Sequence, residues 1–201
     1  MGLALSVAAL LGGLGLAASA LWIPAKAALG HYLIASAYQQ AKASPAATGG
    51  GAESAVARPW SWADWRPMAR LRFPSLGGAE RYVLDQASGE AMAWGAGWIR
   101  GSAPLGAAGL SGVAAHRDTH FALLKGLEPG DVIELETLSG VAARYRMIRG
   151  EVVDSRSWRL PLIHAGPDAL ALSTCWPFGA ETIGPMRYVV FALRIEEADA
   201  A

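Results

Sequence analysis

The sequence has almost no cysteine and no excess of either charge. Its 201 residues include a single cysteine, Cys175, which excludes an internal disulfide and a cysteine-based zinc site. Basic and acidic residues number 17 each, with no block of like charge, so the sequence has no cluster of Lys and Arg that could form a basic surface along a phosphate backbone. We therefore expect no nucleic-acid partner. No acidic cluster is arranged for a metal ion, and we expect neither a metal nor an organic cofactor.

Apolar residues are abundant, and they begin at the N-terminus. Hydrophobic residues make up 53% of the chain, which excludes a disordered protein. Gly2 to Ala25 is a run of 24 uncharged residues, and a bilayer-spanning helix needs roughly 20. We predict that residues 1–25 form a single-pass anchor in the cytoplasmic (inner) membrane, with the rest facing the periplasm or cell exterior. The alternative is a cleaved signal peptide, because Ala18-Ser19-Ala20 has the form of a cleavage site.

The remainder divides into a connecting segment and one domain. Residues 26–57 are predicted to be a helical stalk over Ala27–Ala41 followed by a flexible linker of small residues. From residue 58 to 201 apolar residues alternate with polar ones, and Thr119–Leu127 is the helical exception. Strands are predicted at residues 69–73, 82–84, 91–94, 131–137, 141–148, 151–154, 169–174 and 187–195. About eight short strands indicate an all-β domain with short helices, folded as a closed or nearly closed barrel that avoids exposed edges.

Cys175 stands where a predicted strand ends. Leu170, Leu172 and Thr174 alternate along that strand, and Pro177 then breaks it. Barrel rims hold side chains rigidly at the edge of a cleft, so a thiol there is a candidate nucleophile. The alternative is a small buried core residue, which is the common fate of a lone cysteine.

The chain offers four histidines as a base for the thiol. His116 ends the apolar run 112–115, so a second strand also delivers a reactive side chain at its last residue. His120 lies four residues later and would form a metal pair with His116 on a continuous helix, but the strand context argues against this. His31 belongs to the predicted stalk. His164 lies in a proline-flanked loop and is predicted to be a surface residue.

An acyl-transfer site also needs donors where the oxyanion develops. Arg187 opens the final strand after the loop 178–186, which can fold back to bring its guanidinium beside Cys175. A surface arginine is the alternative. Asp118 could either orient His116 or form an ion pair with Arg117.

Three segments of the chain resemble signatures of the sortases, which are membrane-tethered cysteine transpeptidases. They are Ala114-Ala115-His116-Arg117-Asp118-Thr119-His120-Phe121, Leu172-Ser173-Thr174-Cys175 and Pro185-Met186-Arg187-Tyr188-Val189-Val190. Together with the N-terminal run and the segment Pro59–Asp64, they resemble the Gram-negative type, class GN. Two positions depart from the pattern: Ala115 replaces a common glycine, and Leu172 replaces a common threonine.

The resemblance implies an eight-stranded sortase barrel with catalytic His116, Cys175 and Arg187, and with Thr174 and Asp118 as candidate substrate-binding residues. It implies a protein substrate with an LPxTG-like C-terminal sorting motif, a thioacyl intermediate, and transfer to an amine nucleophile or water. Two other interpretations stay open. An L,D-transpeptidase would show Ser-His-Gly-Cys, where this chain has Leu-Ser-Thr-Cys. A non-enzymatic anchored barrel would bind a partner and bury an inert thiol.

Overall fold

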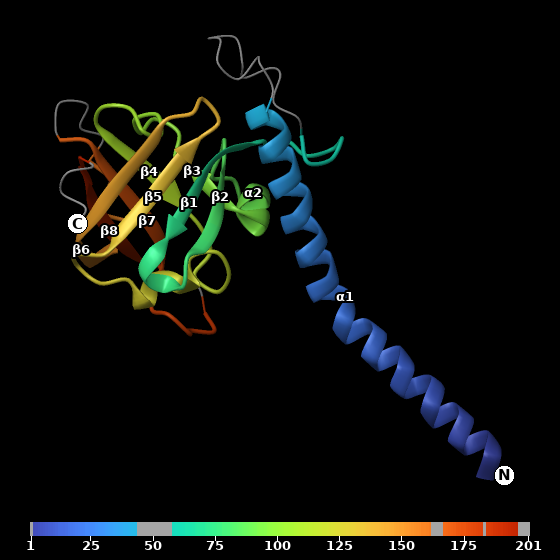
Figure 1. Cartoon of the computed structure of the whole chain (residues 1–201). Coiled ribbons are helices and arrows are strands. Elements are labelled where there is room, and N and C mark those ends of the chain that lie inside the picture. Colours follow the sequence, from blue (N-terminus) through green and yellow to red (C-terminus); the bar gives the residue numbers. More distant parts are fainter. Residues whose placement is uncertain (1, 44–57, 162–166, 183, 197–201) are drawn as a thin grey trace.

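Eight segments of the chain form the strands of a closed barrel, shown in Figure 1, and apolar residues alternate with polar ones in several of them. The structure is a computed structural model that describes residues 2–43, 58–161, 167–182 and 184–196. Its strands are β1 (Pro67–Phe73), β2 (Ala79–Leu84), β3 (Ala96–Trp98), β4 (Leu110–Ala114), β5 (Val132–Thr137), β6 (Ala142–Asp154), β7 (Ala169–Cys175) and β8 (Met186–Ile195). Its helices are α1 (Gly2–Ala43), α2 (Gly89–Trp94) and the 3₁₀ turns η3 (Pro74–Leu76) and η4 (Ala122–Gly126). The predicted eight-stranded all-β barrel is confirmed.

The barrel closes in the order β1-β2-β3-β4-β7-β8-β6-β5. Two neighbouring pairs are parallel, β2 with β3 and β4 with β7, and the other described pairs are antiparallel. Because β4 and β7 are parallel and β8 returns beside β7, three chain segments meet at one end of the barrel. These are the ends of β4 and β7 and the start of β8.

Two apolar layers hold β7 in place. On the inner side, Leu170 and Leu172 are fully buried in the barrel core with residues of β1, β4, β5 and β8. On the outer side, Ala171 packs in a second buried cluster with Val189 and Phe191 of β8. Each fully buried aliphatic side chain contributes roughly 1.5–3 kcal/mol. The odd-numbered positions of β7, which include Cys175, therefore lie on the outer face of the barrel.

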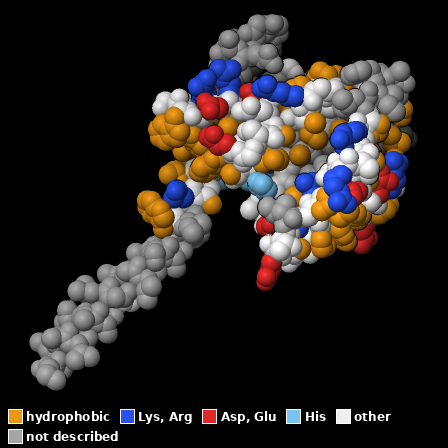
Figure 2. All heavy atoms as spheres, turned by 180° about the vertical axis from the view of Figure 1, so that it is seen from behind, with side chains coloured by type: hydrophobic (Ala, Val, Ile, Leu, Met, Phe, Trp, Pro, Cys, Tyr) orange, Lys and Arg blue, Asp and Glu red, His pale blue; other side chains and the backbone are white. Residues whose placement is uncertain are grey.

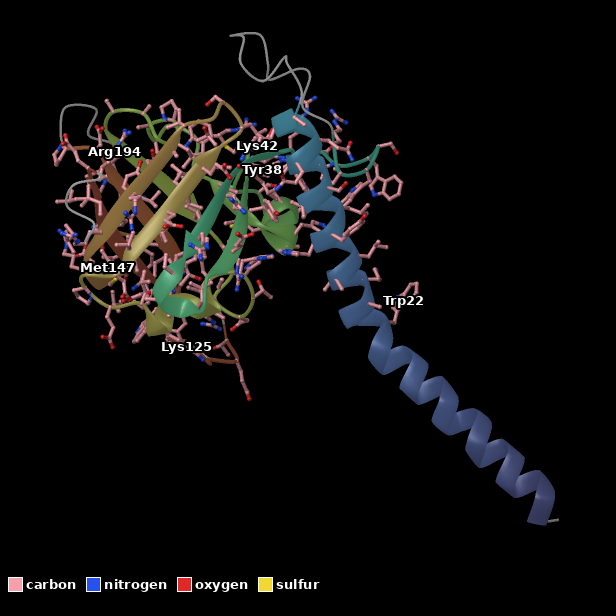
Figure 3. All side chains as sticks on the ribbon, in the orientation of Figure 1. Trp22, Tyr38, Lys42, Lys125, Met147 and Arg194 are labelled. Atoms are coloured by element: carbon pink, nitrogen blue, oxygen red, sulfur yellow. The ribbon has the colours of Figure 1, made fainter. Side chains whose placement is uncertain are left out.

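Helix α1 is continuous from Gly2 to Ala43, and its last turns pack on the barrel. Ile34 and Tyr38 are buried beside Trp65 in a small separate core. The Tyr38 hydroxyl donates to the backbone oxygen of Glu136 at 3.0 Å, and Lys42 forms an ion pair with the Glu136 carboxylate. Figure 3 shows Tyr38 and Lys42 between α1 and the barrel, whereas Figure 1 shows the N-terminal part of α1 running away from it.

The predicted boundary between anchor and stalk at residues 25 and 26 does not interrupt this helix. Within the part of the chain that the structure describes, no helix combines the length and apolarity needed to cross a bilayer. The predicted linker falls almost wholly on residues 44–57, which lie outside the described residues.

Three sequence predictions of local structure need correction. Residues 91–94 belong to helix α2 instead of a strand, because the Ser88 side chain caps the helix by accepting a hydrogen bond from the Ala91 amide at 3.1 Å. Residues 151–154 continue β6 instead of forming a separate strand, with a register shift between Met147 and Arg149. The helix predicted at 119–127 is the shorter turn η4, and β3 was not predicted.

Candidate active site at the ends of β4, β7 and β8

Cys175 is the last residue of β7, and its side chain is half-buried. The following Trp176–Pro177 peptide bond is cis, and the chain leaves the sheet there. The Trp176 amide still donates to the Met186 carbonyl at 3.0 Å, which closes the loop back onto β8. The thiol therefore stands at the edge of the sheet on the outer face, as the alternation along β7 predicts.

Arg187 lies directly opposite Cys175 in the antiparallel pairing of β7 with β8. Directly opposed residues share a face, with Cβ atoms roughly 4.5–5.5 Å apart. The guanidinium Nη1 donates to the carbonyls of Gly184 and Met186, at 2.7 and 2.9 Å. Both bonds use Nη1, so the hydrogens on Nε and Nη2 can be directed at a substrate oxygen.

His116 follows β4 by two residues and is exposed. In the parallel pairing Ala114 lies beside Ser173, and the Ala115 amide donates to the Ser173 carbonyl at 3.1 Å, so the pairing continues past the end of β4. Two residues further along each strand, that register places His116 next to Cys175. The Phe121 amide donates to the His116 carbonyl at 3.0 Å and fixes the turn that follows. The structure thus brings the three predicted catalytic residues to one edge.

The two other predicted site residues have structural partners. Thr174 is only 2% exposed, and its hydroxyl donates to the Ala115 carbonyl at 2.8 Å, which ties β7 to the residue before His116. Asp118 is exposed and accepts a hydrogen bond from Arg117 Nε at 3.3 Å. Of the two roles considered for Asp118, the structure shows this ion pair. The substrate-binding role of both residues stays a prediction.

Arg117 is a residue that sequence reasoning treated only as the partner of Asp118. It is 5% exposed, and its guanidinium donates to the carbonyls of Pro177, Ala180 and Thr182 in the β7–β8 loop. The sequence signal was weak, because a charged pair directly after a strand is typical of a solvent-facing turn. The charge instead points inward, next to the candidate histidine.

The remaining histidines differ in setting. His120 is half-buried, and burial lowers its pKa, while a hydrogen bond to the Ala93 backbone opposes this shift and the charge of Arg81 adds to it. His31 is exposed on α1, with its ring centroid 5.6 Å from that of Tyr82. His164 lies outside the described residues. Within the described ranges no three His, Cys, Asp or Glu side chains gather as a metal site would require.

A charged groove of about 860 Å³ lies elsewhere, along β1, β5, β6 and the end of β8. Its lining does not include the three candidate catalytic residues, and several of its charges are paired, as in Arg72 with Glu134 at 2.8 Å and Arg194 with Asp168 at 3.4 Å. Figure 2 shows both charge signs interspersed with apolar side chains over the barrel. The three candidate catalytic residues lie at the ends of β4 and β7 and the start of β8, outside this groove.

A closed barrel with a free cysteine, a histidine and an arginine at adjacent strand ends defines a candidate cysteine acyl-transfer site. The sortase domain model matches residues 71–195, which covers β2 to β8, all three of these residues and the last three residues of β1. The chain belongs to the sortase family.

Similar proteins support this membership. Sortase D of Bacillus subtilis (strain 168) is 30% identical over 83 residues, so the match spans 41% of this chain and 41% of that protein. The X-ray structure of sortase C from Clostridium perfringens SM101 is 25% identical, with a TM-score of 0.55, over 63% of this chain and 68% of that one. Sortase C2 of Group B Streptococcus Pilus Island 1 is 25% identical, with a TM-score of 0.56, over 64% and 73%.

Proposed function

We propose that this protein is a sortase-type cysteine transpeptidase that cleaves an LPxTG-like motif near the C-terminus of a target protein and transfers the target to an amine. The observation that carries the proposal is the direct cross-strand pairing of Cys175 with Arg187, together with the parallel register of Ala114 beside Ser173, two residues before His116 and Cys175. Family membership favours this chemistry over that of an L,D-transpeptidase. The Gram-negative type within the family rests on the sequence motifs.

The first half-reaction acylates the thiol. The Cys175 thiolate attacks the backbone carbonyl carbon at the scissile bond, and an S–C bond forms while the carbonyl oxygen takes the negative charge. Arg187 donates hydrogen bonds to that oxyanion as a fixed positive charge. The C–N bond then breaks, and His116 gives a proton to the departing amine. The target protein is left attached to Cys175 as a thioester.

The second half-reaction releases the target onto an acceptor. An incoming amine attacks the thioester carbon while His116, now neutral, accepts the proton that the amine loses. The S–C bond breaks, and the Cys175 thiolate is restored. Water in place of the amine gives hydrolysis and a free target protein. The exposed position of His116 suits both roles, because the leaving amine and its replacement reach the same imidazole from solvent.

We further propose that the N-terminal helix holds the enzyme at the cytoplasmic membrane, with the barrel on the periplasmic side. The uncharged run Gly2–Ala25 supports this proposal, as does the part of α1 that runs away from the barrel in Figure 1. A tether beside exported targets raises their effective concentration at the site without any new contact. Membrane fractionation and the mass of the mature N-terminus separate an anchor from a cleaved signal peptide.

The test of the activity uses the purified full chain, a pool of fluorescent LPxTG-like peptides and a short glycine peptide as amine acceptor. We expect a mass adduct at Cys175, a transfer product that requires the acceptor, and loss of both in Cys175→Ala, His116→Ala and Arg187→Ala. His31→Ala and Arg194→Ala are the matched controls, because His31 lies on α1 and Arg194 at the far end of β8 from Arg187.

Two results would count against the proposal. One is a thiol that reacts with iodoacetamide only after denaturation, which would favour a binding module with a buried cysteine. The other is full activity in Arg187→Ala, which would remove the oxyanion role from that residue while leaving the nucleophile in place.

A further inference from the structure

Among the residues that the structure describes, Arg117 is the one charged residue that is buried, and its side chain is 4% exposed. Burying a charge is costly unless hydrogen bonds compensate it. Here the compensation comes almost wholly from one loop. The proposed reaction gives this guanidinium no role, although Arg117 directly follows His116, which acts as acid and base in that reaction.

The contacts of Arg117 are spread along the β7–β8 loop. Nη1 donates to the Pro177 carbonyl at 3.0 Å, and Nη2 donates to the carbonyls of Ala180 and, at 3.0 Å, Thr182. Nε donates to the exposed carboxylate of Asp118 at 3.3 Å. One planar group thus binds three backbone carbonyls of the segment that joins Cys175 to Arg187, and it does so from the turn that carries His116.

The end of the loop has its own anchors, because the Ser155 amide and hydroxyl donate to the Pro185 carbonyl at 2.9 and 2.6 Å and Arg187 donates to the Gly184 carbonyl at 2.7 Å. The part that Arg117 binds, residues 177–182, has few other hydrogen bonds. Pro177 and Thr182 are exposed, and the described backbone bonds within the loop include only a long one, from the Ala180 amide to the Pro177 carbonyl at 3.4 Å. The Phe178 ring packs against Tyr188 at a centroid distance of 5.5 Å, which holds the apolar side of the loop. The Arg117 guanidinium holds the polar side of the loop. Its planar group can donate to several carbonyls at once in a fixed geometry, which a lysine ammonium cannot do.

We propose that Arg117 is a positioning residue for the transpeptidation reaction. It holds the β7–β8 loop against the turn that follows β4, and in this way it fixes the separation between His116 on one side and Cys175 and Arg187 on the other. The inference rests on the proposed function of those three residues. Arg117 itself touches no reacting atom, because its guanidinium points into the protein and is occupied by the loop.

Arg117→Lys is the variant that tests this role, since it keeps the charge and loses the fork. Misplacing reacting groups by about 1 Å can cost on the order of a hundredfold in rate. We expect kcat for peptide transfer, counted per thiol titrated with a maleimide, to fall about tenfold to a hundredfold, with KM within about threefold. Arg117→Gln should lose more, because it removes the charge as well. We expect both variants to stay folded at the assay temperature, because the exposed loop carbonyls can take water.

One variant serves as the control. Arg194→Lys changes an arginine that also bonds a backbone carbonyl, that of Gly106 at 3.1 Å, far from the loop, and should behave like the wild type.

The outcomes separate the inference from the proposed function. A wild-type kcat per titrated thiol in Arg117→Lys, with only a lower melting temperature, would show that Arg117 serves stability alone. Unfolding of Arg117→Lys below the assay temperature would show a role in the whole fold and would also overturn the local role. Activity that survives Cys175→Ala would refute the proposed function itself, whatever the Arg117 variants do.

Discussion

The hydrogen bond between Thr174 and Ala115 gives a sharp test of how β7 supports the candidate histidine. The Thr174 hydroxyl donates to the Ala115 carbonyl at 2.8 Å, and both residues are buried, at 2% and 4% exposure. Thr174→Val keeps the shape of the side chain and removes the donor. Thr174→Ser keeps the donor and removes one methyl group. The pair therefore separates the bond from the packing.

The two substitutions should lower the free energy of unfolding by comparable amounts, one by removing a hydrogen bond and the other by removing packing. A buried carbonyl left without its donor costs about 1–3 kcal/mol, so Thr174→Val should lower the free energy of unfolding by that amount. A missing buried methyl costs about 1 kcal/mol, which is the expectation for Thr174→Ser. In a protein of this size each kcal/mol lowers Tm by about 2–4 °C. Only Thr174→Val also removes the donor that holds the Ala115 carbonyl, directly before His116. We therefore expect kcat to fall, by about tenfold, in this variant alone.

Urea unfolding gives the free energies, and transfer of the sorting-motif peptide gives kcat. Wild-type stability in Thr174→Val would mean that water or another donor replaces the hydroxyl. Equal loss of kcat in the valine and serine variants would refute the reasoning, since it would assign the effect to packing instead of the hydrogen bond.

Three other predictions follow from contacts away from the site. A Cβ on Gly97 would lie 2.4 Å from the Gln86 backbone oxygen and 2.5 Å from Ala87 Cα, so Gly97→Ala should lose about 1–3 kcal/mol in denaturant unfolding; unchanged stability would contradict the close approach of β3. Burial lowers the pKa of His120, so the unfolded chain binds a proton first as the pH falls below the ordinary value of 6.5, and stability drops from there toward the lower folded pKa. His120→Gln should flatten that drop in Tm, and an unaltered profile would argue against it. The hydrogen bond from Lys42 and the charge of Arg70 lower the pKa of Glu136. The ionised Glu136 carboxylate therefore stabilises the folded protein above the ordinary pKa of 4.5, and this stabilisation is lost as the pH falls through the lower folded pKa. Glu136→Gln should loosen the end of α1 and speed tryptic cleavage after Lys42 at neutral pH; equal cleavage rates would disprove the link.

The alternation of apolar and polar residues predicted the strands that pair with the strand next to them in sequence. The hairpin of β5 and β6 and the long strands β7 and β8 were predicted because one face of each meets a core, which enforces alternation. Residues 91–94 were mistaken for a strand because four apolar or small residues carry no period, and the decisive signal was the cap at Ser88. The three-residue strand β3 was missed because a glycine-containing segment that short has no pattern to detect.

The site was predictable in its reactive groups but not in its support. His116, Cys175 and Arg187 each follow or begin a strand, and the sequence shows that directly. Their meeting depends on the parallel pairing of β4 with β7, which no local pattern encodes. The burial of Arg117 was missed for the same reason: its carbonyl partners lie 60 to 65 residues away along the chain.

The parallel pairing of β4 with β7 also has a consequence for the order of folding. Ala115 and Thr174 are 59 positions apart, and the chain between them contains the β5–β6 hairpin. Contacts of such high sequence separation form late, because the entropy of closing the intervening loop is lost before the contact is gained. We therefore expect the thiol to acquire its histidine only when the barrel closes. A chain still leaving the ribosome would therefore carry a cysteine without its histidine, and the proposed acyl transfer would require the fully folded barrel.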